Sequence, residues 1–164
     1  MPIATVTTDD IMPAWMTYAL DECGRKVIEF AGVKANPRIL LYFTKTGLKG
    51  TKLAQSDETA WCSAFACWCM EQAGFRSTRS AAARSWLQWG TPIEFPAHGA
   101  ITVLWRGSPD SAQGHVGFYA GESDNGRDIY LLGGNQKNNS VCIAPYPKTQ
   151  VLSYRWASDY MDGL

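Results

Sequence analysis

The chain has 164 residues, of which 46% are hydrophobic and 12% aromatic, and this composition suits one compact domain with a substantial core. Fifteen basic and fifteen acidic residues cancel, so the charge does not indicate binding to nucleic acid or to an anionic membrane surface. No apolar run approaches the roughly 20 residues that span a bilayer, and the start, MPIATVTTDDIMPAW, lacks the pattern of a signal peptide. We therefore expect a soluble chain that is made in the cytoplasm and does not insert into a membrane.

The first half of the chain has helical periodicity. Apolar residues recur at helical spacing over residues 13–30, and NPRILLYFTKTGL begins after Asn36 with Pro37 in the first turn, where proline is favoured. The stretch DETAWCSAFACWCMEQAGF predicts a third helix that ends at Gly74, and RSAAARSWLQWG predicts a shorter helix that Gly90 closes. Residues 1–12 are expected to form a loose arm.

The second half has the pattern of strands. Short runs rich in β-branched and aromatic residues alternate with Gly, Asn, Asp and Pro clusters, as in an antiparallel meander. These runs are GAITVLWRG, GHVGFYAGE, DIYLLGG, SVCIAPY and QVLSYRWA. We predict an α+β fold in which N-terminal helices pack on a C-terminal antiparallel sheet, with residues 13–164 forming a single domain.

Three of the five cysteines lie on the predicted third helix. At 100° per residue, Cys62, Phe65, Ala66 and Cys69 share one stripe, whereas Cys67 lies well around the helix. This geometry disfavours a compact Cys-x-Cys chelate. The simplest interpretation of Cys67 and Cys69 is that they are small hydrophobic residues of the core.

A structural zinc site needs a second pair of ligands from elsewhere in the chain, and the remaining candidates show no such pairing. These candidates are His98, His115, Cys23 and Cys142. We therefore expect no metal and no cofactor, and the odd number of cysteines favours free thiols.

Cys62 differs from its neighbours because Asp57 or Thr59 is placed to cap the helix, which would put Cys62 in the first turn. The unpaired N–H groups and the positive end of the helix dipole favour a thiolate there, so a lowered thiol pKa is expected. The position makes Cys62 a candidate nucleophile. The alternative is that Cys62 is merely the first core residue of the helix.

A cysteine nucleophile needs an imidazole to take its proton, and the chain has two histidines. His115 opens the strand GHVGFYAGE, whereas His98 lies in a Pro/Gly turn, so His115 is the stronger candidate. The segment LLGGNQKNNS supplies Asn135 or Gln136 as a third group that orients the imidazole. Asn135 is preferred, because the glycines before it allow close approach of the backbone and because Gln136 is expected to point to the other side.

This order of a helix-borne cysteine, a histidine at a strand start and a polar residue after the next strand resembles the papain-like superfamily. More narrowly, NPRILLYFTKTGL, DETAWCSAFACWCMEQAGF, GHVGFYAGE, LLGGNQKNNSV and IAPYPK resemble CHAP and NlpC-type cell-wall amidases and endopeptidases from short bacterial and phage proteins. The resemblance implies that Cys62 is the nucleophile, His115 the general base and acid, and Asn135 the orienting residue. It also implies that the substrate is an amide bond in the peptide stem of peptidoglycan.

Since peptidoglycan lies outside the cytoplasmic membrane, we expect such a protein to act in the periplasm or cell wall after delivery, as a phage lysin or as a secreted antibacterial effector. An effector would imply a cognate immunity protein as partner. Two alternatives stay open: an inactive module that binds the wall or a partner, and a thiol protease or acyltransferase with another amide substrate.

Overall fold

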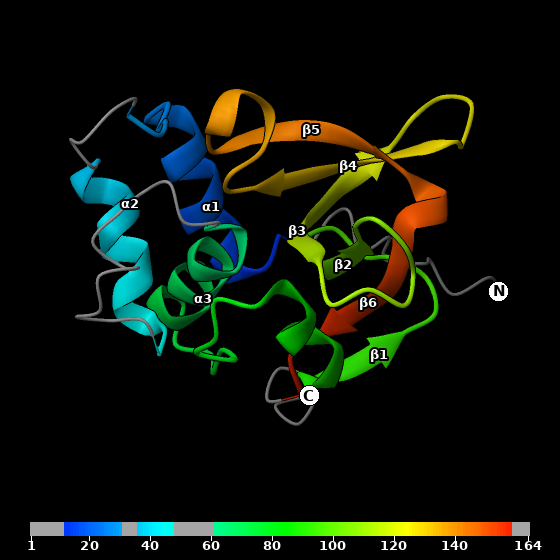
Figure 1. Cartoon of the computed structure of the whole chain (residues 1–164), viewed down its shortest axis with the longest axis horizontal. Helices are drawn as coiled ribbons and strands as arrows, with labels where there is room; N and C mark the ends of the chain where they lie inside the picture. The colour runs from blue at the N-terminus through cyan, green and yellow to red at the C-terminus, as the bar shows by residue number, and fades with distance from the viewer. Residues whose placement is uncertain (1–11, 31–35, 48–60, 159–164) are drawn as a thin grey trace, which may run out of the picture.

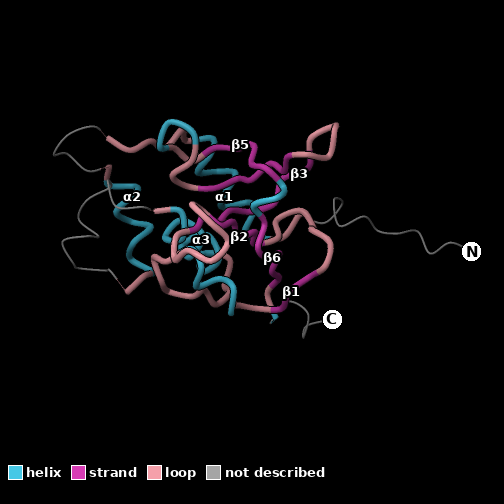
Figure 2. Tube along the Cα trace, turned by 45° about the vertical axis from the view of Figure 1, so that its right-hand side comes forward, coloured by secondary structure: helices cyan, strands magenta, loops and turns pink. Residues whose placement is uncertain are grey.

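The computed structural model describes residues 12–30, 36–47 and 61–158. The helices are α1 (Ala14–Gly24), α2 (Pro37–Tyr42) and α3 (Cys62–Gln72), with short 3-10 helices η2 (Phe43–Lys45), η4 (Ala83–Gln88), η5 (Lys137–Asn139) and η6 (Lys148–Gln150). The strands are β1 (Thr91–Ile93), β2 (Ile101–Trp105), β3 (Gly114–Glu122), β4 (Asp128–Gly133), β5 (Cys142–Pro147) and β6 (Val151–Trp156). The three α-helices gather on one side of the molecule and the strands on the other (Figures 1 and 2).

The predicted α+β fold is confirmed, and all strands pair antiparallel in the order β1-β6-β2-β3-β4-β5. Strands β2 to β5 form the predicted meander, but β6 returns to pair with β2 instead of β5. The short strand β1, which was not predicted, pairs with β6 at the edge of the sheet. Its three residues include Pro92, which an edge strand tolerates and which hides the strand from pattern analysis.

The helix boundaries follow local capping. The side chain of Asn36 accepts a hydrogen bond from the backbone N–H of Arg38 at 2.9 Å, which confirms the predicted start of α2. The chain leaves α3 through Gly74, whose φ is 86°, with a hydrogen bond of 3.0 Å from Phe75 N to Met70 O, so the predicted end is also confirmed. The segment before Gly90 winds as the 3-10 helix η4 instead of an α-helix.

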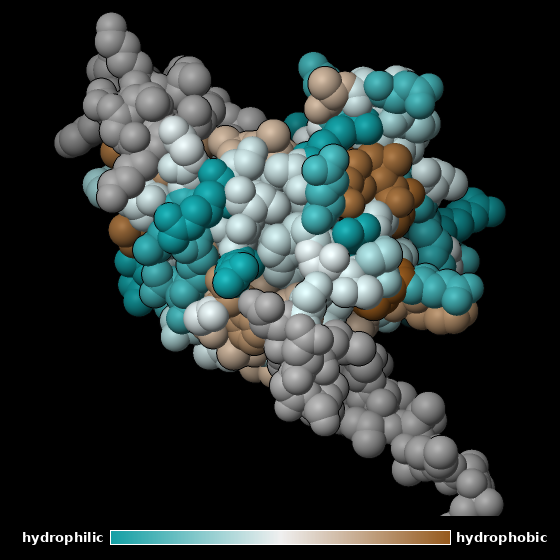
Figure 3. Space-filling view, turned by 90° about the horizontal axis from the view of Figure 1, so that it is seen from below, coloured by the Kyte–Doolittle hydropathy of each residue, from teal (hydrophilic) through white to brown (hydrophobic). Residues whose placement is uncertain are grey.

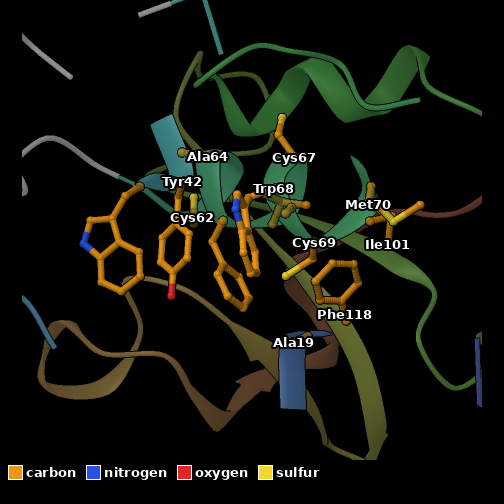
Figure 4. Close-up of a cluster of buried hydrophobic side chains, with 14 of the residues drawn as sticks. Ala19, Tyr42, Cys62, Ala64, Cys67, Trp68, Cys69, Met70, Ile101 and Phe118 are labelled. Atoms are coloured by element: carbon orange, nitrogen blue, oxygen red, sulfur yellow. The ribbon is translucent and has the colours of Figure 1, made fainter. Parts of the chain in front are cut away.

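Helix α3 forms the centre of the core. Residues 62–70 are all buried, and α3 contacts α1, η2 and β3. A helix that is apolar on every side belongs inside the protein, covered by other elements on all faces. Cys67 and Cys69 are fully buried and leave α3 on different sides, which confirms their interpretation as small core residues (Figure 4).

An ion pair between a buried carboxylate and a half-buried arginine joins α1 to α2. The carboxylate of Glu22, which is fully buried, accepts two hydrogen bonds from Arg38, at 2.6 and 3.0 Å, and a third from the Tyr42 hydroxyl at 3.0 Å. Burial of a charge is tolerated when its oxygens are satisfied in this way. The network therefore holds the two helices in one arrangement beside α3.

The surface mixes both kinds of residue, and Figure 3 shows hydrophilic and hydrophobic side chains interspersed on one face. Within residues 12–30, 36–47 and 61–158, no helix has the length and apolar character needed to cross a membrane. The predicted loose arm, apart from Met12, lies outside the described residues.

Candidate active site

Cys62 is the first residue of α3, and its side chain is only 5% exposed. The N-cap residue is Trp61, which offers no side-chain hydrogen bond to the helix. Asp57 and Thr59, which were expected to cap this helix, lie outside the described residues. The expected placement of Cys62 in the first turn is confirmed.

A close approach between α3 and the chain after β4 positions the cysteine. A Cβ atom built on Gly134 would lie 2.7 Å from the Trp61 ring and 2.8 Å from the Cβ atom of Phe65. Contacts this short mean that Trp61 or Phe65 would have to shift to admit a side chain at Gly134. The glycine after β4 thus lets the first turn of α3 reach the sheet.

The thiol of Cys62 lies beside β3. Burial raises the pKa of this thiol, while the backbone N–H of Val116 and the positive charge of Arg106 lower it. The N–H groups of Cys62 and Ser63 at the helix start also lower it, as expected, but burial is the largest effect, so the expectation of a net lowering of the thiol pKa is wrong. Desolvation disfavours the thiolate more than the nearby N–H groups favour it.

His115 is the second residue of β3 and is 1% exposed. It pairs across the sheet with Leu104, and it directly precedes Val116, whose N–H group acts on the Cys62 thiol. The structure thus brings Cys62 to the position on β3 that adjoins His115. The other histidine, His98, lies in the turn between β1 and β2.

The imidazole of His115 is held by Gln136. Atom Nε2 of His115 lies 3.0 Å from Oε1 of Gln136. The amide nitrogen of Gln136 donates to the carbonyl oxygens of Leu131, at 2.9 Å, and of Cys142, at 2.6 Å. Since both carbonyls are acceptors, the amide must turn its NH2 group toward them and its oxygen toward the histidine. His115 therefore carries its proton on Nε2, which leaves a lone pair on Nδ1.

The expectation that the Asn135 amide accepts from the imidazole is wrong for this structure. Gln136 is 6% exposed and makes that bond, whereas Asn135 is half-buried with a φ of 55°. Asparagine tolerates this left-handed conformation better than most residues, so Asn135 serves the turn. A positive φ redirects the next residue, and the longer side chain of Gln136 then reaches back over the sheet.

The site favours a neutral imidazole. Burial lowers the pKa of His115 to about 4; the hydrogen bond that its Nε2–H donates to Gln136 raises the pKa, and the charge of Arg106 lowers it further. Atom Nδ1 is buried and has no hydrogen-bond partner among the described residues. The ring stacks on Tyr146 of β5, with centroids 5.0 Å apart and an interplanar angle of 29°. Around neutral pH this arrangement presents a base that is neutral, oriented and unoccupied.

Two residues beside the site, Arg106 and Tyr146, were not predicted from the sequence. The spacing of motifs along the chain does not reveal either residue, because their proximity depends on the strand register and on β5 lying beyond β4. As for metal ligands, the described part of the chain contains no group of three or more His, Cys, Asp or Glu side chains suited to hold an ion.

A buried central helix that begins with a cysteine and packs on an antiparallel sheet carrying a histidine is the papain-like arrangement. The CHAP domain family matches residues 54–135, which is half of the chain. The chain belongs to the CHAP family. This family consists in general of amidases and peptidases that act on peptidoglycan. The matched range contains Cys62 and His115 and ends one residue before Gln136. No curated protein and no solved structure matches the chain.

Proposed function

We propose that this protein is a cysteine hydrolase that cleaves an amide bond in the peptide stem of peptidoglycan, with Cys62 as nucleophile, His115 as general base and acid, and Gln136 as orienting residue. The observation that carries the proposal is the state of His115. Its Nε2–H is bound to Gln136, its Nδ1 lone pair is unpartnered among the described residues, and Cys62 adjoins the same strand. If His115 only filled the core, both of its ring nitrogens would be expected to have hydrogen-bond partners.

Acylation begins when Nδ1 of His115 takes the thiol proton and the sulfur of Cys62 attacks the amide carbonyl carbon. The imidazolium that forms keeps its Nε2–H bond to Gln136, so the ring stays aligned during the transfer. The negative charge on the carbonyl oxygen is stabilised by the backbone N–H of Cys62, because the first N–H groups of a helix have no intrahelical partner.

Breakdown of the tetrahedral intermediate releases the amine half of the substrate. The proton on Nδ1 of His115 passes to the leaving nitrogen, and Cys62 is left as a thioester. Water then gives its proton to the same Nδ1 atom and attacks the thioester. The second intermediate collapses as the Nδ1 proton passes to the departing sulfur, which restores the thiol of Cys62, and the released carboxylic acid ionises to a carboxylate in water. Because Gln136 is neutral, it fixes the tautomer of His115 without adding charge.

The raised pKa of Cys62 and the lowered pKa of His115 both favour the neutral pair over the ion pair before substrate binds. Proton transfer is therefore coupled to attack on the carbonyl instead of preceding it. Since peptidoglycan is the proposed substrate, the site of action is the cell wall or the periplasm, reached through phage lysis or a secretion system.

The test is incubation with purified sacculi, followed by chromatography of the soluble products. The protein should release soluble muropeptides with new amino and carboxyl ends, and Cys62→Ala should release none while keeping its melting temperature. Cys67→Ala is the matched control, because Cys67 lies in the same helix but its sulfur contacts Thr78 and Ser80, and it should retain turnover. Binding to sacculi without release of fragments would favour a non-enzymatic module and would refute the proposal.

A further inference from the structure

Arg106 lies next to His115 on the same face of the sheet. Leu104 pairs directly with His115, and the backbone N–H of Arg106 donates to the carbonyl oxygen of Gln113 at 3.3 Å, which continues the pairing past the end of β2. Because side chains alternate along a strand, residues 104 and 106 share a face. Arg106 is thus the diagonal neighbour of His115, at a separation that a long side chain spans.

The charge of Arg106 acts on three groups of the candidate site. It lowers the pKa of Cys62, His115 and Tyr146, which belong to α3, β3 and β5 respectively. A single cation that influences groups on three elements has its guanidinium near the point where those elements meet. Arg106 is also exposed, so its charge faces a position that a ligand can reach.

The guanidinium of Arg106 has no structural task in the described part of the chain. No carboxylate lies within 4.0 Å of it there, whereas Arg25, Arg38 and Arg79 all form ion pairs. The loop after β2 is already held by Arg84, which donates to the carbonyl oxygens of Gln113, Pro109 and Ser108. An arginine beside a reactive centre with its five donors unused is placed to bind an anion.

We propose that Arg106 binds a free carboxylate of the substrate next to the scissile amide, and thereby selects acidic peptide stems over stems in which that carboxylate is amidated. The inference rests on the proposed function, because the position of the carboxylate is defined relative to the bond that Cys62 attacks. The guanidinium fork matches a carboxylate with two parallel hydrogen bonds, and a neutral amide fills only part of that site. His115 and Tyr146 are neutral in the resting protein, so they do not compete for the anion.

The experiment compares two peptides that differ only by a carboxylate or a carboxamide beside the scissile bond. The wild-type protein should cleave the carboxylate peptide with a kcat/KM about 10- to 100-fold higher, the range expected for a charged hydrogen-bonded pair. Arg106→Gln should reduce this ratio to within about 2-fold, and Arg106→Lys should keep a part of it, since lysine retains charge but not the fork. Arg127→Gln is the matched control, because Arg127 is exposed in the turn between β3 and β4, at the opposite end of β3 from His115, and it should leave the ratio unchanged.

Two outcomes overturn the inference. One is a wild-type protein that does not distinguish the peptides; the other is an Arg106→Gln variant that loses the same factor on both, which would show that Arg106 acts on Cys62 and His115 instead of on substrate. Failure of this inference is distinguished from failure of the proposed function by calorimetry, which measures the affinity of the Cys62→Ala protein for both peptides without cleavage. If the wild-type protein cleaves neither peptide, the proposed function fails, while a binding preference that disappears with Arg106→Gln still supports the carboxylate site.

Discussion

Replacement of Gln136 by alanine tests the centre of the candidate site. The substitution removes the acceptor of the His115 Nε2–H and the donors to the carbonyl oxygens of Leu131 and Cys142. All three bonds involve one side chain that is 6% exposed, so water replaces them poorly. We therefore expect Gln136→Ala to lower both stability and turnover.

The magnitudes follow from the groups left behind. A buried polar group without a partner costs about 1–3 kcal/mol. Three such groups remain in Gln136→Ala, and water that enters the space left by the amide offsets part of their combined cost. We expect a loss of about 3 kcal/mol in the free energy of unfolding. For turnover, His115 stays in place but loses its fixed tautomer and orientation, which corresponds to a drop in kcat of about 10- to 100-fold. His115→Ala removes the base itself and should cost about 100- to 10,000-fold.

Three measurements check this reasoning. Urea titration gives the free energy of unfolding, hydrolysis of soluble stem peptides gives kcat, and nitrogen NMR of the imidazole gives the tautomer. In the wild-type protein the proton of His115 should lie on Nε2 at neutral pH. In Gln136→Ala the two tautomers should become mixed.

Asn135→Gly is the matched control, because glycine adopts the φ of 55° at this position without a side chain. This variant should keep kcat within about 2-fold, since the amide of Asn135 does not hold the imidazole. A silent Gln136→Ala together with a crippled Asn135→Gly would refute the assignment. So would a wild-type spectrum with the proton on Nδ1.

Further predictions concern the nucleophile, the packing of α3, and pH. Cys62→Ser should abolish release of muropeptides from sacculi while circular dichroism shows an unchanged fold, and retained activity would remove Cys62 from the mechanism. Gly134→Ala should lower the free energy of unfolding by about 1–3 kcal/mol, because its Cβ atom collides with the Trp61 ring, whereas Gly24→Ala meets no atom within 4 Å and should be neutral or stabilising in the same urea titration. Burial lowers the pKa of His115 to about 4 from the ordinary 6.5, so the unfolded chain takes up the proton first and stability falls as the pH drops from about 6.5 to about 4. This loss is at most about 3 kcal/mol, and the difference between wild type and His115→Ala at pH 7 and pH 4 measures it. Treatment with a chelator should leave hydrolysis of sacculi unchanged, and stoichiometric zinc in the purified protein would contradict that expectation.

Local chemistry was enough to locate the nucleophile and base candidates. The apolar periodicity before Gly74 places Cys62 in the first turn of a helix, and the β-branched and aromatic residues after Gly114 place His115 at the start of a strand. The helix caps at Asn36 and Gly74 were also predictable, because capping depends on residues only a few positions apart. The family resemblance then implied the roles of nucleophile for Cys62 and general base for His115.

Properties that depend on long-range packing were not predictable. The choice between Asn135 and Gln136 was decided by a positive φ and by carbonyl groups of β4 and β5, and no pattern within the segment records where those carbonyls lie. The thiol pKa of Cys62 rises because elements from distant parts of the chain exclude water from α3, an effect that outweighs the local helix dipole. The position of Arg106 beside His115 follows from strand register, which only the assembled sheet defines.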